Sequence, residues 1–218
     1  VVRAERPDVI EGSSPWSGGW FAARAPGSAP RALVFHQDAV AVYGHSLFDR
    51  YVGAARLDRI ARPYWGYLRA LSSHFDRTIV SGAWLADRLA RFGIRVPTAV
   101  PFGVDRARFS VARSCPIRRA ALLSSCGLGS RATLLVAVSR LHPEKRVGTL
   151  IDAIARLEGS SAFPYGLGLV VVGDGPLASY LRARARASRR VHFAGFFAEP
   201  NALPEVVACA DAFLHGSS

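Results

Sequence analysis

The stretch TLLVAVSRLHPEKRVGTLIDAIARL, residues 133–157, decides the fold class of this 218-residue chain. Its first part, residues 133–139, is a short apolar run and predicts a buried strand. Its last part carries Val147, Ile151 and Ile154 at helical spacing, which predicts a helix with one apolar face. A strand that leads directly into such a helix is the repeating unit of α/β proteins with parallel sheets.

The same alternation continues on both sides of this stretch. Helices are predicted at residues 47–73 and 83–92, after Pro176 and around Val206. Further short strands, each apolar or β-branched, are predicted at residues 8–12, 31–36, 77–82, 98–103, 166–173, 191–195 and 211–215. The sequence therefore predicts an α/β protein with mainly parallel sheets.

Scattered Arg, Ser, Cys and Gly residues interrupt this alternation in the middle of the chain. We interpret residues 111–131 as a linker, with one α/β domain at residues 1–110 and a second at residues 132–218. The chain contains no methionine, and its first residues already read like the interior of an α/β domain. We therefore expect it to be a piece of a longer protein.

The composition indicates a globular protein with a basic surface. Half of the residues are apolar, yet none of the apolar runs reaches the ~20 residues of a membrane span, so we expect a cytoplasmic protein. The three cysteines form no CxxC pair, and we expect neither a disulfide framework nor a metal site. The net charge of +12 favours acidic partners, either nucleotide phosphates or an anionic membrane surface. Nucleic acid is disfavoured, because no nucleic-acid motif accompanies the charge.

Arg140 and Lys145 are the leading candidates for a binding site. Arg140 ends a predicted strand, and Lys145 is interpreted as part of the first turn of the next helix, where a cation is unfavourable unless an anion is bound. Lys145 is also the only lysine beside 27 arginines. Both residues are expected at the crevice where open α/β sheets bind ligands, and a diphosphate would suit them. The alternative is a solvated basic turn.

Two further features are weaker on their own. Gly173 and Gly175 flank an aspartate where a strand passes into a helix, which suits either a tight structural turn or close approach to a ligand. His36 ends a predicted strand and should project from the carboxyl edge of the first sheet, although a loop histidine is often only structural. The arginines of residues 182–190 could contact anionic lipid, but a solvated helix face is the favoured interpretation.

Several motifs, in order, resemble one enzyme family. The segments VAVSRLHPEKRVGTLIDAIARL, LVVVGDGP, VHFAGFF and ACADAFLHGSS resemble the donor-binding half of retaining GT-B-fold glycosyltransferases of glycosyltransferase family 4. The segments FHQD, FDRTIVSGAWLADRLARFGI and VPFGVDRARF resemble the acceptor-side half. FHQD and FLHGSS are most similar to bacterial α-mannosyltransferases that use GDP-mannose. The resemblance implies two Rossmann-like domains, both incomplete in this chain.

The resemblance also implies roles for individual residues. Residues matching Arg140 and Lys145 bind the donor diphosphate, and a histidine matching His36 lies near the transferred sugar. Gly195, Phe196 and Phe197 match the region that lines the nucleotide base, and Gly173 and Gly175 belong to the same donor-binding half. Transfer is expected to retain configuration without a metal or other cofactor, because the cationic pair replaces a metal ion.

The expected activity is transfer of a hexose, with mannose favoured, from a nucleotide-diphosphate sugar to a lipid or glycan acceptor. GDP-mannose is favoured over a UDP-sugar, and the protein is placed in the cytoplasm or peripherally on the inner face of the membrane. Family members carry a Gly-rich loop before the region that corresponds to residue 1, and a loop with two glutamates after the region that corresponds to Ser218. Residues 1–218 alone are therefore expected to be inactive. The alternatives are a non-catalytic module for nucleotide sugars or anionic lipid, and a sucrose- or glycogen-type synthase.

Overall fold

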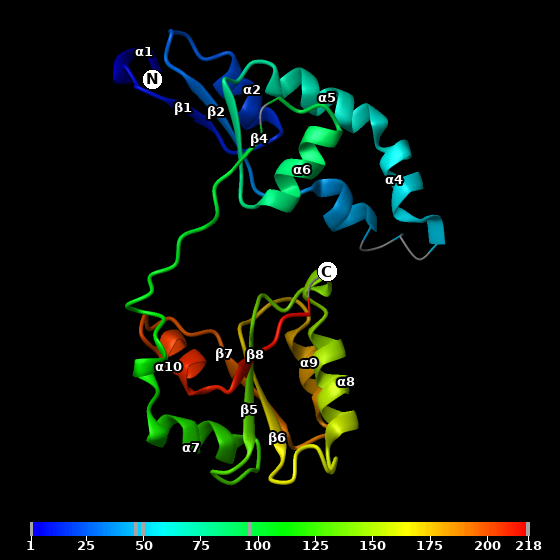
Figure 1. The fold of residues 1–218 in the computed structure, drawn as a ribbon, viewed down its shortest axis with the longest axis vertical. Coiled ribbons are helices and arrows are strands. Elements are labelled where there is room, and N and C mark those ends of the chain that lie inside the picture. Colours follow the sequence, from blue (N-terminus) through cyan, green and yellow to red (C-terminus); the bar gives the residue numbers. More distant parts are fainter. Residues whose placement is uncertain (1, 46–47, 49–50, 96, 217–218) are drawn as a thin grey trace. The chain divides into compact units, whose positions relative to one another are not determined.

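The computed structural model describes residues 2–45, 48, 51–95 and 97–216 and divides the chain into two compact units, Val1–Gly103 and Val104–Ser218 (Figure 1). Each unit holds one four-stranded sheet in which all paired strands are parallel. The predicted α/β class with parallel sheets is therefore confirmed. In these described ranges, no helix combines the length and apolar character needed to cross a membrane.

The first unit has the strand order β1-β2-β3-β4. Alternate residues of its central strands are buried, Leu33 and Phe35 on β2 and Thr78 and Val80 on β3, as the pleat of a strand requires. In chain order its elements are α1 (Val2–Glu5), β1 (Ile10–Gly12), α2 (Ser17–Ala23), β2 (Arg31–Phe35), a π-helical turn (Val40–His45), α4 (Ala54–Ile60), α5 (Arg62–Ser72), β3 (Arg77–Val80), α6 (Ala83–Arg91) and β4 (Pro97–Ala99).

All four strands predicted in this unit are present. The helical stretch predicted at residues 47–73 is divided into α4 and α5 at Ala61, whose ψ of 6° departs from helical geometry. Residues 46–47 and 49–50 of that region lie outside the described residues. Helix α2 and the π-helical turn were not predicted.

The second unit has the strand order β7-β6-β5-β8. Its elements in chain order are a 3₁₀ turn (Val111–Arg113), α7 (Pro116–Ser125), β5 (Thr133–Val138), a second 3₁₀ turn (Pro143–Lys145), α8 (Val147–Leu157), β6 (Leu167–Val172), α9 (Ala178–Ala185), β7 (Val191–Gly195), α10 (Ala202–Cys209) and β8 (Ala212–Phe213). The four strands correspond to the four that the sequence predicts.

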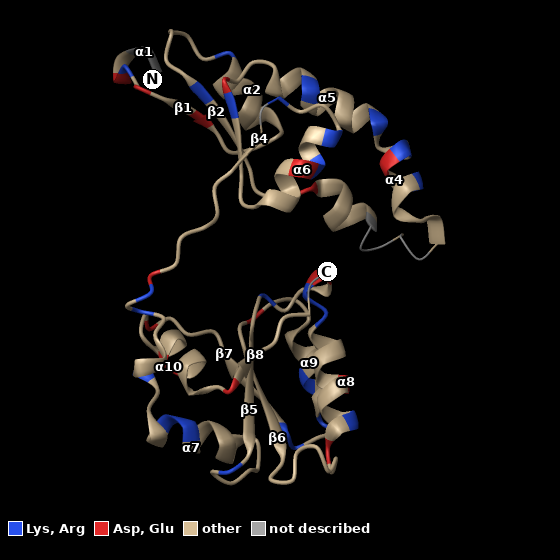
Figure 2. Cartoon of the chain, viewed as in Figure 1, with Lys and Arg blue, Asp and Glu red and all other residues tan. Residues whose placement is uncertain are grey.

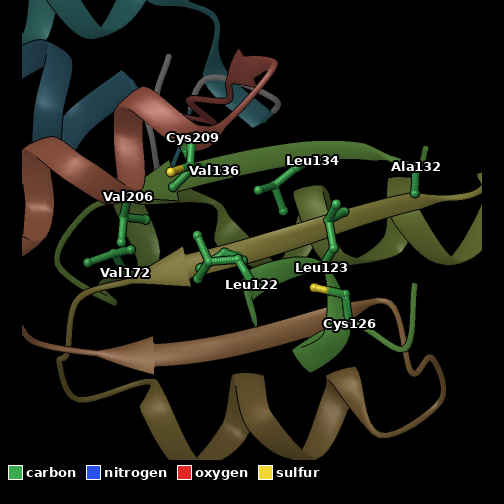
Figure 3. Packing of buried hydrophobic residues seen from close by; sticks show 10 residues of the cluster. Leu122, Leu123, Cys126, Ala132, Leu134, Val136, Val172, Val206 and Cys209 are labelled. Carbon is green, nitrogen blue, oxygen red and sulfur yellow. The ribbon is translucent and has the colours of Figure 1, made fainter. Parts of the chain in front are cut away.

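Two hydrophobic clusters, one on each face, fix the sheet of the second unit. Strand β6 is buried along its whole length, as expected for a central parallel strand covered on both sides. Val170 and Val172 pack with residues of α7 and α10, including Leu123 and Val206 (Figure 3). Leu169 and its neighbours at alternate positions pack instead with residues of α8 and α9. The helix pairs therefore cover opposite faces of this sheet (Figure 1).

The region proposed as a linker, residues 111–131, is largely ordered within the second unit. Helix α7 lies in it, and Leu122, Leu123 and Cys126 belong to the hydrophobic core. Arg119 of the same helix donates hydrogen bonds to the carbonyls of Cys209 and Ala132. These contacts join residues far apart in sequence, so the local pattern of Arg, Ser and Cys gave no sign of them.

Candidate functional site

The candidate site lies at the edge of the second sheet where its strands end. Strands β5, β6 and β7 follow one another in one direction across the sheet, whereas β8 pairs with the opposite side of β5. Open α/β sheets commonly bind ligands in a crevice at such a reversal, beside the loops that follow the two strands where it occurs, here β5 and β8. The loop after β5, residues 139–146, and the residues after β8, 214–216, border this position.

The loop after β5 contains a short turn before α8 begins. Pro143–Lys145 form one 3₁₀ turn, and Arg146 adopts the left-handed conformation with φ 46° and ψ 34°. Helix α8 starts only at Val147. The interpretation that Lys145 lies in the first turn of α8 is therefore wrong, because Pro143 opens a separate turn and the left-handed Arg146 interrupts the helical path.

The cations of this loop have few anionic partners. The Nζ atom of Lys145 is 3.8 Å from Oε1 of Glu144, which is an ion pair but too long for a hydrogen bond. Arg140 and Arg146 are exposed and form no ion pair within the described part of the chain. By contrast, Arg184 on α9 binds Asp152 at 2.6 Å. The crevice edge therefore carries positive charge that is available to an anion.

The segment after β8 packs against the same loop. A Cβ atom at Gly216 would lie 2.8 Å from the carbonyl oxygen of Lys145 and 3.2 Å from that of Arg146. The backbone N–H of Leu214 donates a hydrogen bond to Val136 on β5 at 2.7 Å. Gly216 thus permits a close backbone approach beside the cations. Sequence reasoning did not assign it to the site, although a glycine soon after a short strand is a signal of such an approach.

Gly173 and Gly175 pack against the loop after β5. A Cβ atom at Gly173 would lie 2.0 Å from the carbonyl oxygen of Ser139, and one at Gly175 would lie 2.7 Å from that of Leu141. The Leu141 N–H donates to the carbonyl of Asp174 at 2.9 Å. The close contact between two loops accounts for both glycines without a ligand. Their assignment to donor binding remains a proposal.

The segment after β7 presents its two phenylalanines differently. Phe196 is exposed, whereas Phe197 packs against the hydrophobic cluster on the α7 and α10 face. Gly195 adopts a φ of +76° and accepts a hydrogen bond from the Gly173 N–H at 2.8 Å. This segment therefore lies at the same edge of the sheet as the loops described above, because β7 runs parallel to its neighbours.

His36 lies directly after β2, at the carboxyl edge of the first sheet, as predicted. Its side chain is exposed and lines a pocket of about 200 Å³. The Tyr64 hydroxyl in this pocket is buried and has no hydrogen-bond partner among the described residues. Burial, and then the charge of Asp38, raise the pKa of Tyr64 to about 12, so the hydroxyl keeps its proton at neutral pH. The other residues of the pocket are Ser13, Ser14, Pro15, Trp16, Phe35, Gln37, Ala39 and Tyr43.

Sequence reasoning missed Trp16 and Tyr64 as members of this pocket. Trp16 precedes a helix that was not predicted, and Tyr64 lies in a run of aromatic residues that resembles ordinary core. Their ring centroids are 6.0 Å apart although 48 positions separate them in the sequence. Only the packing of α5 beside the loop before α2 brings the two side chains together.

The arginines of residues 182–190 are largely occupied within the second unit. Arg184 binds Asp152, Arg190 lies 3.2 Å from Glu158, and the guanidinium of Arg182 lies 5.0 Å from the ring centre of Phe193. These contacts support the favoured interpretation of a structural, solvated face. No cluster of His, Cys, Asp and Glu side chains suited to a metal ion occurs in the described ranges.

The chain has two α/β units, each with a parallel sheet, and the second has a cationic loop at the reversal of its strand order. This arrangement is shared by GT-B glycosyltransferases. Residues 1–108 match the family model described as Glycosyltransferase Family 4, and residues 125–218 match the model described as Glycosyl transferases group 1. The chain belongs to this family of glycosyltransferases.

The individual relatives agree with the family. The chain is 27% identical over 215 residues to a GDP-mannose-dependent α-(1-6)-phosphatidylinositol dimannoside mannosyltransferase of Mycobacterium tuberculosis, covering 98% of this chain and 52% of that protein. It is 30% identical over 184 residues to a GDP-mannose-dependent α-mannosyltransferase of Corynebacterium glutamicum, covering 84% of this chain and 40% of that protein. The chain thus spans about half the length of the curated relatives it matches, or less.

The structural similarity supports the fold. A solved glycosyltransferase from Rickettsia africae matches 99% of this chain and 53% of its own, with a TM-score of 0.63 and 12% sequence identity. At that identity the similarity concerns the fold alone. The GT-B fold expected from the sequence motifs is confirmed.

Proposed function

We propose that this chain is part of a retaining hexosyltransferase that transfers mannose from GDP-mannose to a lipid or glycan acceptor. The names of the two relatives described above support the donor, and the phosphatidylinositol dimannoside named for one of them supports a lipid acceptor. The observation that carries the proposal is the loop of Arg140 and Lys145 at the reversal of the strand order, where few carboxylates neutralise the cations.

The chemistry of this loop suits a leaving nucleotide diphosphate. The planar guanidinium of Arg140 can donate two parallel hydrogen bonds to phosphate oxygens, and the ammonium of Lys145 provides a compact charge. When the bond between the sugar and the diphosphate breaks, negative charge grows on the diphosphate. Fixed cations lower the energy of that state more than that of the bound substrate, which is how electrostatic catalysis works.

Three further assignments belong to this proposal. His36 lies near the transferred sugar, and its ring accepts or donates a hydrogen bond there. The main chain of Gly195, Phe196 and Phe197 lines the nucleotide base. Gly173 and Gly175 contribute by holding the loop of Arg140 in position, since both pack against it.

The direct test is calorimetric titration of the chain with GDP and with UDP. The Lys145→Ala variant should bind GDP at least about tenfold more weakly, because a hydrogen bond to a charged group contributes about 1.5 to 3 kcal/mol. Arg189→Ala is a matched control. It removes one exposed cation of the same unit that has no ion pair among the described residues and lies just before β7, at the opposite edge of the sheet.

Equal affinities of Lys145→Ala and of the wild-type chain for GDP would contradict the proposal. A loss of affinity shared by Arg189→Ala would also count against it, because only the overall charge would then matter. In the longer protein that contains this chain, transfer of labelled sugar from GDP-mannose, compared with UDP-glucose, tests the donor. Tight GDP binding without any transfer by the longer protein would favour the non-catalytic module.

A further inference from the structure

The first unit contains a second basic site that lies on its helices. A groove of about 450 Å³ is bordered by α4, α5 and α6, and Figure 2 shows basic residues, all of them arginine, on all three helices. Four arginines line it, together with one carboxylate, two aromatic residues and one alanine: Arg59, Arg62, Arg69, Arg91, Asp58, Trp65, Phe92 and Ala55. His36 and its pocket share none of these residues.

The single carboxylate of the groove is already engaged by a different arginine. Asp58 accepts two hydrogen bonds from Arg88, at 3.0 and 2.7 Å. Arg88 is buried, also binds Asp38 and does not itself line the groove. None of the four lining arginines forms an ion pair with any residue that the structure describes. The groove therefore combines four guanidinium groups with almost no compensating negative charge.

Two stacked aromatic rings line this groove, and one of them carries a hydrogen-bond donor that has no partner among the described residues. The rings of Trp65 and Phe92 stack in parallel, with centroids 4.0 Å apart and an interplanar angle of 1°. Trp65 is only 2% exposed, and its indole Nε1 has no acceptor among the described residues. A buried N–H without a partner is uncommon and unfavourable.

We propose that this groove binds a phosphate ester. A phosphate monoester offers three acceptor oxygens and a charge of about −1.5 to −2 near neutral pH, which matches several guanidinium groups in one hollow. Its oxygens accept hydrogen bonds from Arg62 and Arg91. The stem of Arg69 packs beside Gly93, where an added Cβ atom would lie 3.1 Å from the Arg69 Cδ atom. This site is separate from the diphosphate site proposed for the second unit.

The test uses the tryptophan indole signals of the ¹⁵N-labelled chain. All four tryptophans precede residue 104, so glycerol 3-phosphate bound at Arg140 and Lys145 has no tryptophan in its own unit to report it. Titration with glycerol 3-phosphate at constant ionic strength should shift the Trp65 indole signal in a saturable manner. The signals of Trp16 and Trp20 serve as internal references for an intact fold.

The double variant Arg62→Gln/Arg91→Gln should weaken this response at least about tenfold, because it removes two charge-assisted contacts. The matched control is Arg77→Gln/Arg95→Gln, which removes two exposed arginines of the same unit outside the groove and should respond like the wild type. No shift of Trp65, or an equal response of both double variants, would overturn the proposal.

Vesicles distinguish the source of the phosphate. Phosphatidylcholine vesicles containing phosphatidic acid, a lipid whose headgroup is a phosphate monoester, compared with phosphatidylcholine alone, should broaden the Trp65 signal in the wild type but not in Arg62→Gln/Arg91→Gln if the ligand is a lipid headgroup. A response to glycerol 3-phosphate but to neither vesicle assigns the groove to a soluble phosphate ester. Equal broadening by both vesicles in both proteins would show apolar adsorption and would count against the groove.

Discussion

Replacing Gly173 with alanine should separate the loop after β6 from the loop after β5, which borders the crevice of the second unit. The added Cβ atom would lie 2.0 Å from the carbonyl oxygen of Ser139, whereas ordinary van der Waals contact begins at 3.4 Å. Both partners are backbone, so no side chain can rotate away, and one loop must move by about 1 Å or more. That movement would strain the hydrogen bonds from Leu141 to Asp174 and from Leu177 to Leu141.

The cost of this substitution has two parts. Gly173 has a φ of +130°, and forcing an alanine into such a conformation costs about 1 to 3 kcal/mol. Overpacking of a well-packed region typically adds about 1 to 3 kcal/mol. We therefore expect Gly173→Ala to lower the free energy of unfolding of the second unit by about 2 to 6 kcal/mol. Affinity for GDP should fall as well, because Arg140 directly follows Ser139.

The Gly159→Ala variant separates the conformational cost from the overpacking cost. Gly159 also has a positive φ, +80°, but a Cβ atom there would meet nothing within 4 Å. This control should lose only the conformational part, about 1 to 2 kcal/mol, and should keep the affinity for GDP.

Urea unfolding followed by circular dichroism measures the loss in free energy of unfolding. Tryptophan fluorescence reports on the first unit alone, since Trp16, Trp20, Trp65 and Trp84 all lie there, and its transition should stay unchanged. Equal destabilisation by Gly173→Ala and Gly159→Ala would refute the close-contact argument. Weaker GDP binding at unchanged stability would instead indicate that Gly173 contacts the ligand directly.

Two further substitutions test the ion pairs of each unit. Arg88→Met should destabilise the first unit by about 3 to 5 kcal/mol, because it leaves the buried Asp38 carboxylate uncompensated. Unfolding followed by tryptophan fluorescence measures this loss of stability. The double variant Arg88→Met/Asp38→Asn should recover part of it. Burial acts to raise the pKa of Asp211, but hydrogen bonds from the Leu134 N–H and from Arg119 outweigh it and hold the pKa below its usual value. A lowered pKa adds stability above the unfolded-state value and loses it as the pH falls through the folded-state value. Asp211→Asn should therefore destabilise the second unit at neutral pH, and its difference from the wild type should shrink as the pH falls into the acid range; a difference that stays constant throughout would contradict this.

The strands were predictable because their signal is local. Buried parallel strands are continuous apolar runs, and β6, with the sequence LGLVVV, is the clearest example. The apolar face of α8 was equally clear, since Val147, Ile151 and Ile154 are all buried. Parallel strands joined by helices then place every strand end at one edge, so the position of Arg140 could be inferred without coordinates.

Elements that depend on distant contacts escaped prediction. Helix α2 begins SGG, a poor helical sequence, but a side chain at Gly19 would lie 2.3 Å from the Ser14 carbonyl and 3.1 Å from Leu71. Helix α7 was missed because Arg119 gains its partners from residues 132, 209 and 211. The shape of the loop at residues 139–146 escaped for the same reason, since the contact between Gly216 and Lys145 spans 71 positions.

The distribution of ion pairs in the second unit explains why an anion should choose the crevice. Arg119 pairs with Asp211 at 2.9 Å beside the start of β5, and Arg190 pairs with Glu158 just before β7, both at the edge where strands begin. An anion that approached either of these two arginines would have to displace a carboxylate that already occupies its place. At the opposite edge, Arg140 and Arg146 have no such partner in the described part of the chain, and Lys145 has only a distant one. An incoming phosphate would therefore be attracted there without breaking a close ion pair.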